Sequence, residues 1–230
     1  MDNSIFNYWF YILPAFILGS IPSGYLLTKI LFKKDVRQYG SKNIGSTNVG
    51  RTFGSKYGYI TLFLDMLKGY IGVLISYNLL TSKYISLENP QVEQVNLIIS
   101  FLPLFAVLGH AYSPFMKWKG GKGVATTFGS FIFFNFEYML ICLSAYLITI
   151  KKSKFVSLGS IISTCLLPLT SYLYLEENLK IIHKNGNYYL ESNDYTSYIL
   201  IQTLPIIILV MFLHRENIKR LKEGSESQIK

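Results

Sequence analysis

Three short segments of this chain carry groups that can hold a phosphate or a carboxylate, namely glycine backbone and hydroxyl, amide or basic side chains. The first segment is Gly40–Arg51, which includes Ser41, Asn43, Asn48 and the cation of Arg51. Its composition predicts an anion-binding site. The alternative is a flexible loop, because Gly, Ser and Asn are ordinary turn residues.

The second segment, Lys117–Thr127, contains Gly120, Gly121, Lys122 and Gly123 directly before an apolar run. A helix that begins at this point would aim its free N–H groups at a bound phosphate. The spacing is not that of a Walker A loop. The alternative is a basic turn on the inner side of a membrane.

The third segment is His214–Leu221, which follows the last apolar run. His214 and Asn217 are three residues apart and therefore share one helical face, which could point into a site. Lys219 and Arg220 are typical of a basic anchor on anionic lipid.

A few ionisable or reactive side chains also lie inside apolar runs. Asp65 and Lys68, at i and i+3, are expected to pair with each other, and such groups usually face a polar cavity. His110 is either a hydrogen-bonding residue at a helix end or part of a site wall. Cys142 and Cys165 lack metal-ligand spacing and are interpreted as small buried hydrophobic residues. The sequence predicts no metal site and no cofactor.

The elements that position these segments are apolar runs, because half of the residues are hydrophobic and only 15% are charged. Several runs approach the length of a membrane span. We expect an all-α, polytopic integral membrane protein with a single domain over residues 1–230 and about seven helices, near 8–32, 58–80, 97–112, 124–134, 138–150, 155–173 and 198–213. The helices at 124–134 and 138–150 are short, so one or both are expected to be partly re-entrant. Pro22 predicts a kink, and polar loops are expected at 33–56 and 174–197.

The basic residues give an orientation. With the N-terminus outside, 18 of the 22 Lys and Arg residues fall in inner segments and three in outer loops. This bias predicts an outer N-terminus and a cytoplasmic C-terminus, and it explains the net charge of +9 without nucleic acid. Asp2 is the only early charge, so the first apolar run is not expected to be a cleaved signal peptide.

The motifs together resemble one family. Gly19–Gly24, Gly40–Arg51, Leu108–Thr126, Val156–Ile161 and His214–Leu221 are similar to those of the bacterial acyl-phosphate-dependent glycerol-3-phosphate acyltransferases, known as PlsY. The resemblance implies a seven-helix enzyme of the cytoplasmic (inner) membrane with its active site facing the cytoplasm. It also implies that the fatty acyl group of an acyl phosphate passes to the sn-1 hydroxyl of glycerol 3-phosphate, giving lysophosphatidic acid and inorganic phosphate.

Site residues follow from the same resemblance. The catalytic set is Ser41, Arg51, Lys122, His214 and Asn217, with Arg51 and Lys122 expected to bind phosphate. The substrate-binding set is Asn43, Asn48, His110, Gly120, Gly121, Gly123 and Ser157. The reaction needs no strong general base, since the acyl phosphate is already activated, and either a substrate phosphate or His214 could accept the hydroxyl proton.

Two other functions compete with this one. A small-solute transporter would share the helices and buried charges, but internal repeats are absent. A non-catalytic membrane subunit would leave the three glycine-rich or basic inner segments unexplained. The expected partners are glycerol 3-phosphate, a fatty acyl phosphate and membrane lipid.

Overall fold

The fold is helical and divides into two compact units made of interleaved segments. The computed structural model describes residues 8–84, 92–178, 180–184, 187–191 and 196–229. The first unit comprises Met1–Tyr11, Tyr77–Phe101 and Asn135–Lys230, and the second comprises Ile12–Ser76 and Leu102–Phe134. Each unit is described by itself below, and the single domain over 1–230 stays a prediction.

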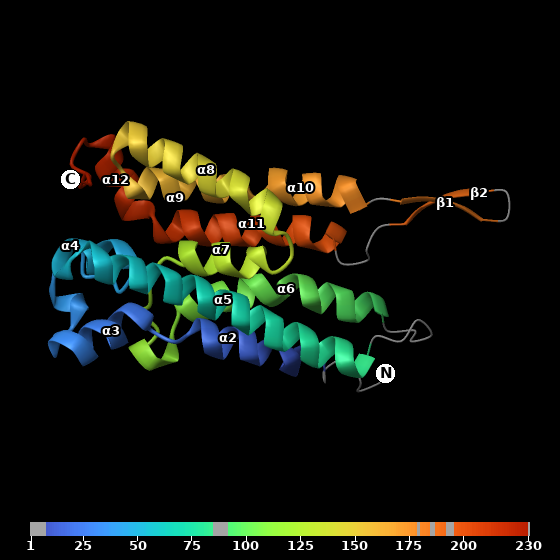
Figure 1. The fold of residues 1–230 in the computed structure, drawn as a ribbon, viewed down its shortest axis with the longest axis horizontal. Helices are drawn as coiled ribbons and strands as arrows, with labels where there is room; N and C mark the ends of the chain where they lie inside the picture. Colours follow the sequence, from blue (N-terminus) through green and yellow to red (C-terminus); the bar gives the residue numbers. More distant parts are fainter. Residues whose placement is uncertain (1–7, 85–91, 179, 185–186, 192–195, 230) are drawn as a thin grey trace. The chain divides into compact units, whose positions relative to one another are not determined.

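The second unit contains most of the predicted phosphate-binding segments (Figure 1). Its helices are α2 (Leu13–Gly19), α3 (Ser23–Phe32), α4 (Ser46–Phe53), most of α5 (Ser55–Tyr84), the end of α6 (Val92–Ala111) and α7 (Val124–Ile132), with the 3-10 turns η2 (Val36–Gln38) and η3 (Pro114–Met116). The 3-10 turn η1 (Trp9–Ile12) reaches this unit only with its last residue. The chain breaks between α2 and α3, where Pro22 cannot donate a backbone hydrogen bond. The predicted kink is therefore confirmed.

Glycines allow α2 and α6 to approach closely. A Cβ on Gly19 would overlap the carbonyl oxygen of Ala106, and a Cβ on Gly109 would overlap that of Phe16. Small residues at such crossings bring helix backbones into direct contact, as is common in membrane proteins. This packing fixes the end of α6, from which the glycine-rich segment leaves.

The stretch predicted as a polar loop at 33–56 contains the helix α4 and the turn η2. Asp35 begins η2 by accepting the backbone N–H of Arg37 at 2.9 Å. A small core forms beneath these elements from Val36, Ile44, Val49 and Met116. The apolar residues between the glycines provide this core, so the segment is folded and the flexible-loop interpretation is wrong.

The first unit contains α8 (Phe136–Ser153), α9 (Val156–Cys165), α10 (Leu167–Asn178), α11 (Thr196–Leu213) and α12 (Arg215–Lys222). Helix α8 lies beside α9 and α10, and α10 lies beside α11 (Figure 1). Strands β1 (Lys180–Lys184) and β2 (Asn187–Glu191) pair antiparallel, with Ile182 opposite Tyr189. The expected polar loop at 174–197 is therefore corrected, because the end of α10 and this short hairpin occupy much of the segment. The other described elements are helices, as the predicted all-α fold requires.

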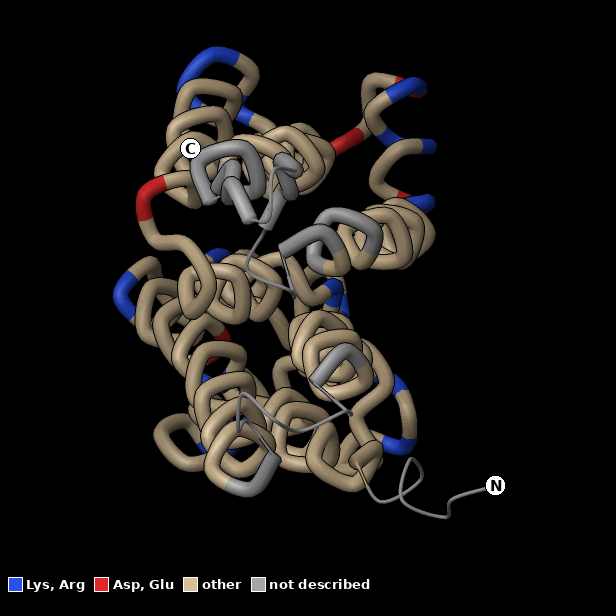
Figure 2. The backbone as a smooth tube through the Cα atoms, turned by 90° about the vertical axis from the view of Figure 1, so that its right-hand side faces the viewer, with Lys and Arg blue, Asp and Glu red and all other residues tan. Residues whose placement is uncertain are grey.

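Four helices are long and apolar enough to cross a membrane among the described residues, namely Trp9–Phe32, Ser55–Ser82, Gln94–Met116 and Val156–Leu173, and Gln202–Leu213 is a shorter apolar helix. Lys, Arg, Asp and Glu gather mainly at helix ends and connections, while the helix lengths are largely uncharged (Figure 2). Helix α7 has nine residues, which reach only about 14 Å and cannot span about 30 Å of hydrocarbon. The count of seven spans stays a prediction.

One prediction about the cysteines is wrong. Cys142 is buried, but Cys165 is exposed at the end of α9. In a membrane-embedded helix the outward face can be apolar, so an apolar sequence context does not decide whether a side chain faces protein or lipid.

Candidate active site

The glycine-rich segment is fastened to the end of α6 by its own backbone. Gly120 donates its N–H to the carbonyl of Ala111 at 2.9 Å, and Gly121 donates to the carbonyl of His110 at 3.1 Å. Gly123 then begins α7 with a φ of 81°, a left-handed conformation that favours glycine. The segment thus ends at a helix N-terminus, as the sequence predicts.

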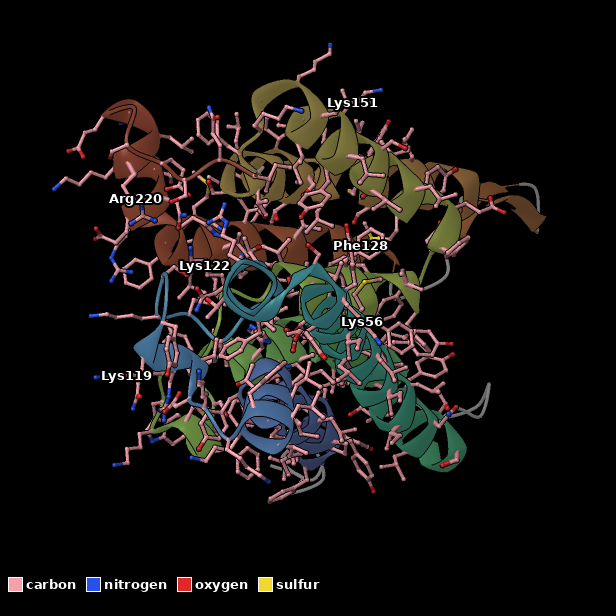
Figure 3. All side chains as sticks on the ribbon, turned by 60° about the vertical axis from the view of Figure 1, so that its left-hand side comes forward. Lys56, Lys119, Lys122, Phe128, Lys151 and Arg220 are labelled. Carbon is pink, nitrogen blue, oxygen red and sulfur yellow. The ribbon has the colours of Figure 1, made fainter. Side chains whose placement is uncertain are left out.

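Space around this segment is too small for side chains at the two central glycines. A Cβ on Gly120 would overlap the carbonyl oxygen of His110, and a Cβ on Gly121 would overlap Nε2 of the His110 ring. Since the next residue is Lys122, the position of this lysine depends on the contact between the loop and His110. Lys122 is half-buried, whereas Lys119 on the same segment is exposed (Figure 3).

Asn48 organises the segment Gly40–Arg51. Its Oδ1 accepts the N–H of Ser41 at 2.9 Å, and its Nδ2 donates to the carbonyls of Tyr39 at 3.0 Å and Asn43 at 2.8 Å. The residue is 3% exposed. This geometry favours an internal role for Asn48 over the predicted contact with substrate.

Ser41 and Arg51 remain at the surface of the second unit. Both are exposed, and Arg51 lies in the last turn of α4. Asn43 is half-buried and accepts the N–H of Gly45 at 2.8 Å, which shapes the entry to α4. A surface-exposed hydroxyl and guanidinium on a folded segment can reach a soluble phosphate, which is the role predicted for them.

In the first unit, His214 and Asn217 lie at the start of α12 and are both buried, with 3% and 7% exposure. Nδ1 of His214 is 2.9 Å from the carbonyl oxygen of Val210. Because a carbonyl only accepts, Nδ1 must be the protonated nitrogen, and a neutral ring then carries its lone pair on Nε2. A neutral ring in this tautomer presents an acceptor, and not a donor, at Nε2.

Glu226 is a residue that the sequence analysis missed. Its Oε1 accepts hydrogen bonds from Ser157 at 3.1 Å and Asn217 at 2.8 Å, and its Oε2 accepts from Arg220 at 2.7 Å. Its side chain is only 5% exposed. The tail is fastened further by the N–H of Ile229, which donates to the carbonyl of Lys154 at 2.9 Å.

This carboxylate is held ionised. Burial alone would raise the pKa of Glu226, but the hydrogen bonds from Asn217, Arg220 and Ser157 and the positive charge of Arg220 lower it below its ordinary value. Two predicted site residues, Ser157 and Asn217, are thus brought together by an anion of the chain itself. The sequence marks Glu226 only as an acidic residue in a basic tail. This pattern is common on protein surfaces and does not indicate a buried site.

His110 is buried at the end of α6, and its Nδ1 is 3.1 Å from Oγ1 of Thr126. It touches the glycine-rich segment, so the structure brings it together with Gly120 and Gly121. The described residues include no group of three His, Cys, Asp or Glu side chains that could hold a metal ion.

Comparison with known proteins gives a consistent result. Residues 9–224 match the family described as glycerol-3-phosphate acyltransferase. A glycerol-3-phosphate acyltransferase of Leptospira borgpetersenii serovar Hardjo-bovis (strain JB197) is 38% identical over 96% of this chain and 90% of its own length. One of Desulfotalea psychrophila is 37% identical over 95% of this chain and 96% of its own length.

Solved structures agree with the sequence relatives. The crystal structure of PlsY, an integral membrane glycerol 3-phosphate acyltransferase, in its glycerol 3-phosphate form, matches with a TM-score of 0.74 and 32% identity over 97% of this chain and 96% of that one. The lysophosphatidic acid form matches with a TM-score of 0.73 and 31% identity over the same shares. The resemblance noted in the motifs is thereby confirmed, and the chain belongs to the glycerol-3-phosphate acyltransferase family.

Proposed function

We propose that this protein transfers a fatty acyl group from an acyl phosphate to the sn-1 hydroxyl of glycerol 3-phosphate. The family membership supports acylation of glycerol 3-phosphate rather than solute transport. The observation that carries the proposal is the glycine-rich loop that ends at the N-terminus of α7 with Lys122 beside it. Backbone N–H groups and a lysine suit substrates that both carry phosphate.

The bond changes are simple. The sn-1 oxygen attacks the acyl carbonyl carbon, the bond between this carbon and the phosphate oxygen breaks, and inorganic phosphate leaves. Because phosphate departs from a mixed anhydride without protonation by the protein, the protein mainly positions both substrates and stabilises charge on the carbonyl oxygen. In this proposal the hydroxyl proton passes to a substrate phosphate or to the imidazole of His214.

The residue roles are part of the proposal. Arg51 and Lys122 bind phosphate charge, and Ser41 hydrogen-bonds a phosphate oxygen from the same unit as Arg51. Gly120, Gly121 and Gly123 allow the backbone to approach the acyl phosphate. Asn43 and His110 shape the second unit around these residues, whereas the contacts of Asn48 favour an internal role.

The site residues assigned to the first unit have hydrogen-bonded positions of their own. Asn217 and Ser157 present their polar groups around the carboxylate of Glu226, and His214 lies at the start of the same helix as Asn217. We propose that Glu226 orients these two side chains by accepting their hydrogen bonds.

The membrane arrangement is also proposed. The apolar helices support a multi-pass membrane protein. We infer that the N-terminus lies outside the cytoplasmic membrane of a bacterium, that about seven segments cross it, and that the active site faces the cytoplasm, because most Lys and Arg residues fall in the segments assigned to that side. Cysteines placed singly in the segments 33–56 and 185–186 should then be labelled from opposite sides of sealed membranes.

A donor test distinguishes the acyl phosphate from other acyl carriers. Purified protein in detergent receives glycerol 3-phosphate with acyl phosphate, acyl-CoA or acyl carrier protein of the same chain length, and lysophosphatidic acid is measured. Product from acyl phosphate alone supports the proposal. Product from acyl-CoA or acyl carrier protein alone contradicts the donor assignment, and no product from any donor contradicts the acyltransferase function.

A further inference from the structure

An ion pair lies deep in the second unit beside the glycine-rich loop. Asp65 and Lys68 on α5 are 3% and 7% exposed, and Lys68 Nζ is 2.8 Å from Asp65 Oδ1. The predicted pairing is thus confirmed. A buried pair in a membrane protein is costly to keep, so its neighbours indicate what it does.

The lysine links α5 to the break in the first membrane segment. Lys68 Nζ donates to the carbonyl oxygen of Ile21 at 2.6 Å, and this carbonyl lies where Pro22 interrupts the helix. One residue earlier, the carbonyl of Ser20 accepts the hydroxyl of Ser113 at 2.6 Å. Ser113 opens the segment that leads into the glycine-rich loop.

The aspartate faces His110. Oδ1 of Asp65 is 3.7 Å from His110 Nδ1, and although it is also near Lys68 it makes no well-directed hydrogen bond. Nδ1 of His110 is 3.1 Å from the hydroxyl of Thr126 in the first turn of α7. A carboxylate on this side favours the proton on Nδ1 and fixes the orientation of the ring. The opposite nitrogen, Nε2, then lies against Gly121.

Helices α5 and α7 are in direct contact around this pair. A Cβ on Gly129 would overlap the carbonyl oxygen of Met66, and a Cβ on Gly69 would overlap that of Thr126. Because these contacts join backbones, a shift of α5 is passed to the start of α7. The loop before α7 is therefore held from both ends, by His110 and by α5.

We propose that Asp65 and Lys68 are positioning residues for the acyl transfer, acting through His110 to hold Gly121 and the adjacent Lys122 where they meet phosphate. This inference rests on the function proposed above. In this arrangement His110 supports the loop with its ring and its backbone carbonyl, and the ion pair supports His110. A pair that serves only the stability of the fold would leave substrate binding unchanged whenever the protein folds.

The test replaces the pair by neutral side chains of similar size, Asp65→Asn with Lys68→Met, so that no single charge is left buried. A matched control replaces a more exposed pair of the same unit, Asp35→Asn with Arg37→Met, whose side chains are 17% and 38% exposed. Thermal unfolding in detergent and the KM values for both substrates are measured alongside wild type.

We expect a folded double variant of Asp65 and Lys68 with a KM raised at least about tenfold for one phosphate substrate, because a displacement of about 1 Å can cost 100-fold in rate. The control should keep KM within about twofold, since exposed pairs contribute little. Unchanged KM and kcat in a folded variant would overturn the inference. Wild type without acyl transfer would instead contradict the proposed function.

A second variant tests the same inference if the double variant of Asp65 and Lys68 does not fold. Thr126→Val removes the hydroxyl beside His110 Nδ1 while keeping the volume and every charge. Its KM for the same substrate is expected to rise by several-fold, and Thr126→Ser, which restores the hydroxyl, should return most of the binding. Wild-type KM in folded Thr126→Val would refute the positioning role of the ring.

Discussion

The loop Gly120–Gly123 and the tail around Glu226 carry predicted site residues and are held by opposite means. The loop is held by backbone hydrogen bonds and by contacts so close that a methyl group does not fit beside His110. The tail is held by one carboxylate that accepts hydrogen bonds from three side chains. Adding atoms to the loop should therefore disturb its conformation, and removing the charge of Glu226 should disturb the tail.

The largest effect is expected at the cation that the loop presents. Lys122→Ala should lower kcat/KM by about 100-fold or more, because it removes a charged donor from a phosphate or from charge that develops in the reaction. Lys119→Ala is the matched control, since Lys119 is exposed on the same segment. Equal loss in both variants would show that general positive charge matters rather than the position of Lys122.

Adding a methyl group to the loop tests how it is held. Gly121→Ala should lower kcat/KM by about tenfold or more, because the His110 ring must move to admit the methyl group and overpacking costs about 1–3 kcal/mol. Gly50→Ala is the control, because its Cβ would lie 3.4 Å from Gly58 Cα, an ordinary contact. Steady-state kinetics and melting temperature that match wild type in Gly121→Ala would contradict the close packing.

Removing the tail charge tests the second region. Glu226→Gln keeps the size of the side chain but should cost about 1 kcal/mol or more of stability, because three donors lose an ionised acceptor. Activity should fall with it, as Ser157 and Asn217 lose their orientation. Glu223→Gln serves as control, because Glu223 is 54% exposed and 4.0 Å from Lys219. A melting temperature equal to that of wild type would refute this role.

The pH dependence of stability also tests the role of the ionised Glu226. The pKa of Glu226 lies below its ordinary value of 4.5, so its ionised form stabilises the fold above that value and the contribution is lost as the pH falls through the lower folded pKa. Melting temperatures measured from pH 7 down to pH 3 should therefore converge for wild type and Glu226→Gln. A difference that stays constant over this range would argue against an ionised carboxylate.

The smallest effect is expected at a partly exposed carboxylate in the same unit as the loop. The hydrogen bonds and charge of Arg37 lower the pKa of Asp35, but the pair lies at the surface. Asp35→Asn should change the free energy of unfolding by less than about 1 kcal/mol and leave kcat unchanged. Denaturant unfolding measures this, and a loss as large as that of Glu226→Gln would remove the contrast between exposed and buried carboxylates.

Local patterns predicted much of this molecule. The break at Pro22 and the pairing of Asp65 with Lys68 follow from neighbouring residues, and the structure confirms both. The glycine-rich loop and the start of α7 also lie where the sequence places them. Each of these features depends on residues within one or two helical turns.

Features that depend on distant contacts could not be predicted. Glu226 bonds to Ser157 across 69 residues of sequence, and nothing near Glu226 indicates this partner. The sequence around Asn48 suits an amide that binds a ligand, yet the hydrogen bonds of this side chain go to its own loop. The exposure of Cys165 depends on which face of α9 packs inward, a property that an apolar stretch does not show.

The most direct measurement is phosphate release by purified protein given acyl phosphate and glycerol 3-phosphate, with Lys122→Ala and Lys119→Ala alongside. Wild type and Lys119→Ala are expected to release phosphate and form lysophosphatidic acid only when both substrates are present, while Lys122→Ala is nearly inactive. Phosphate release by wild type without glycerol 3-phosphate, or full activity in Lys122→Ala, would contradict acyl transfer at the glycine-rich loop.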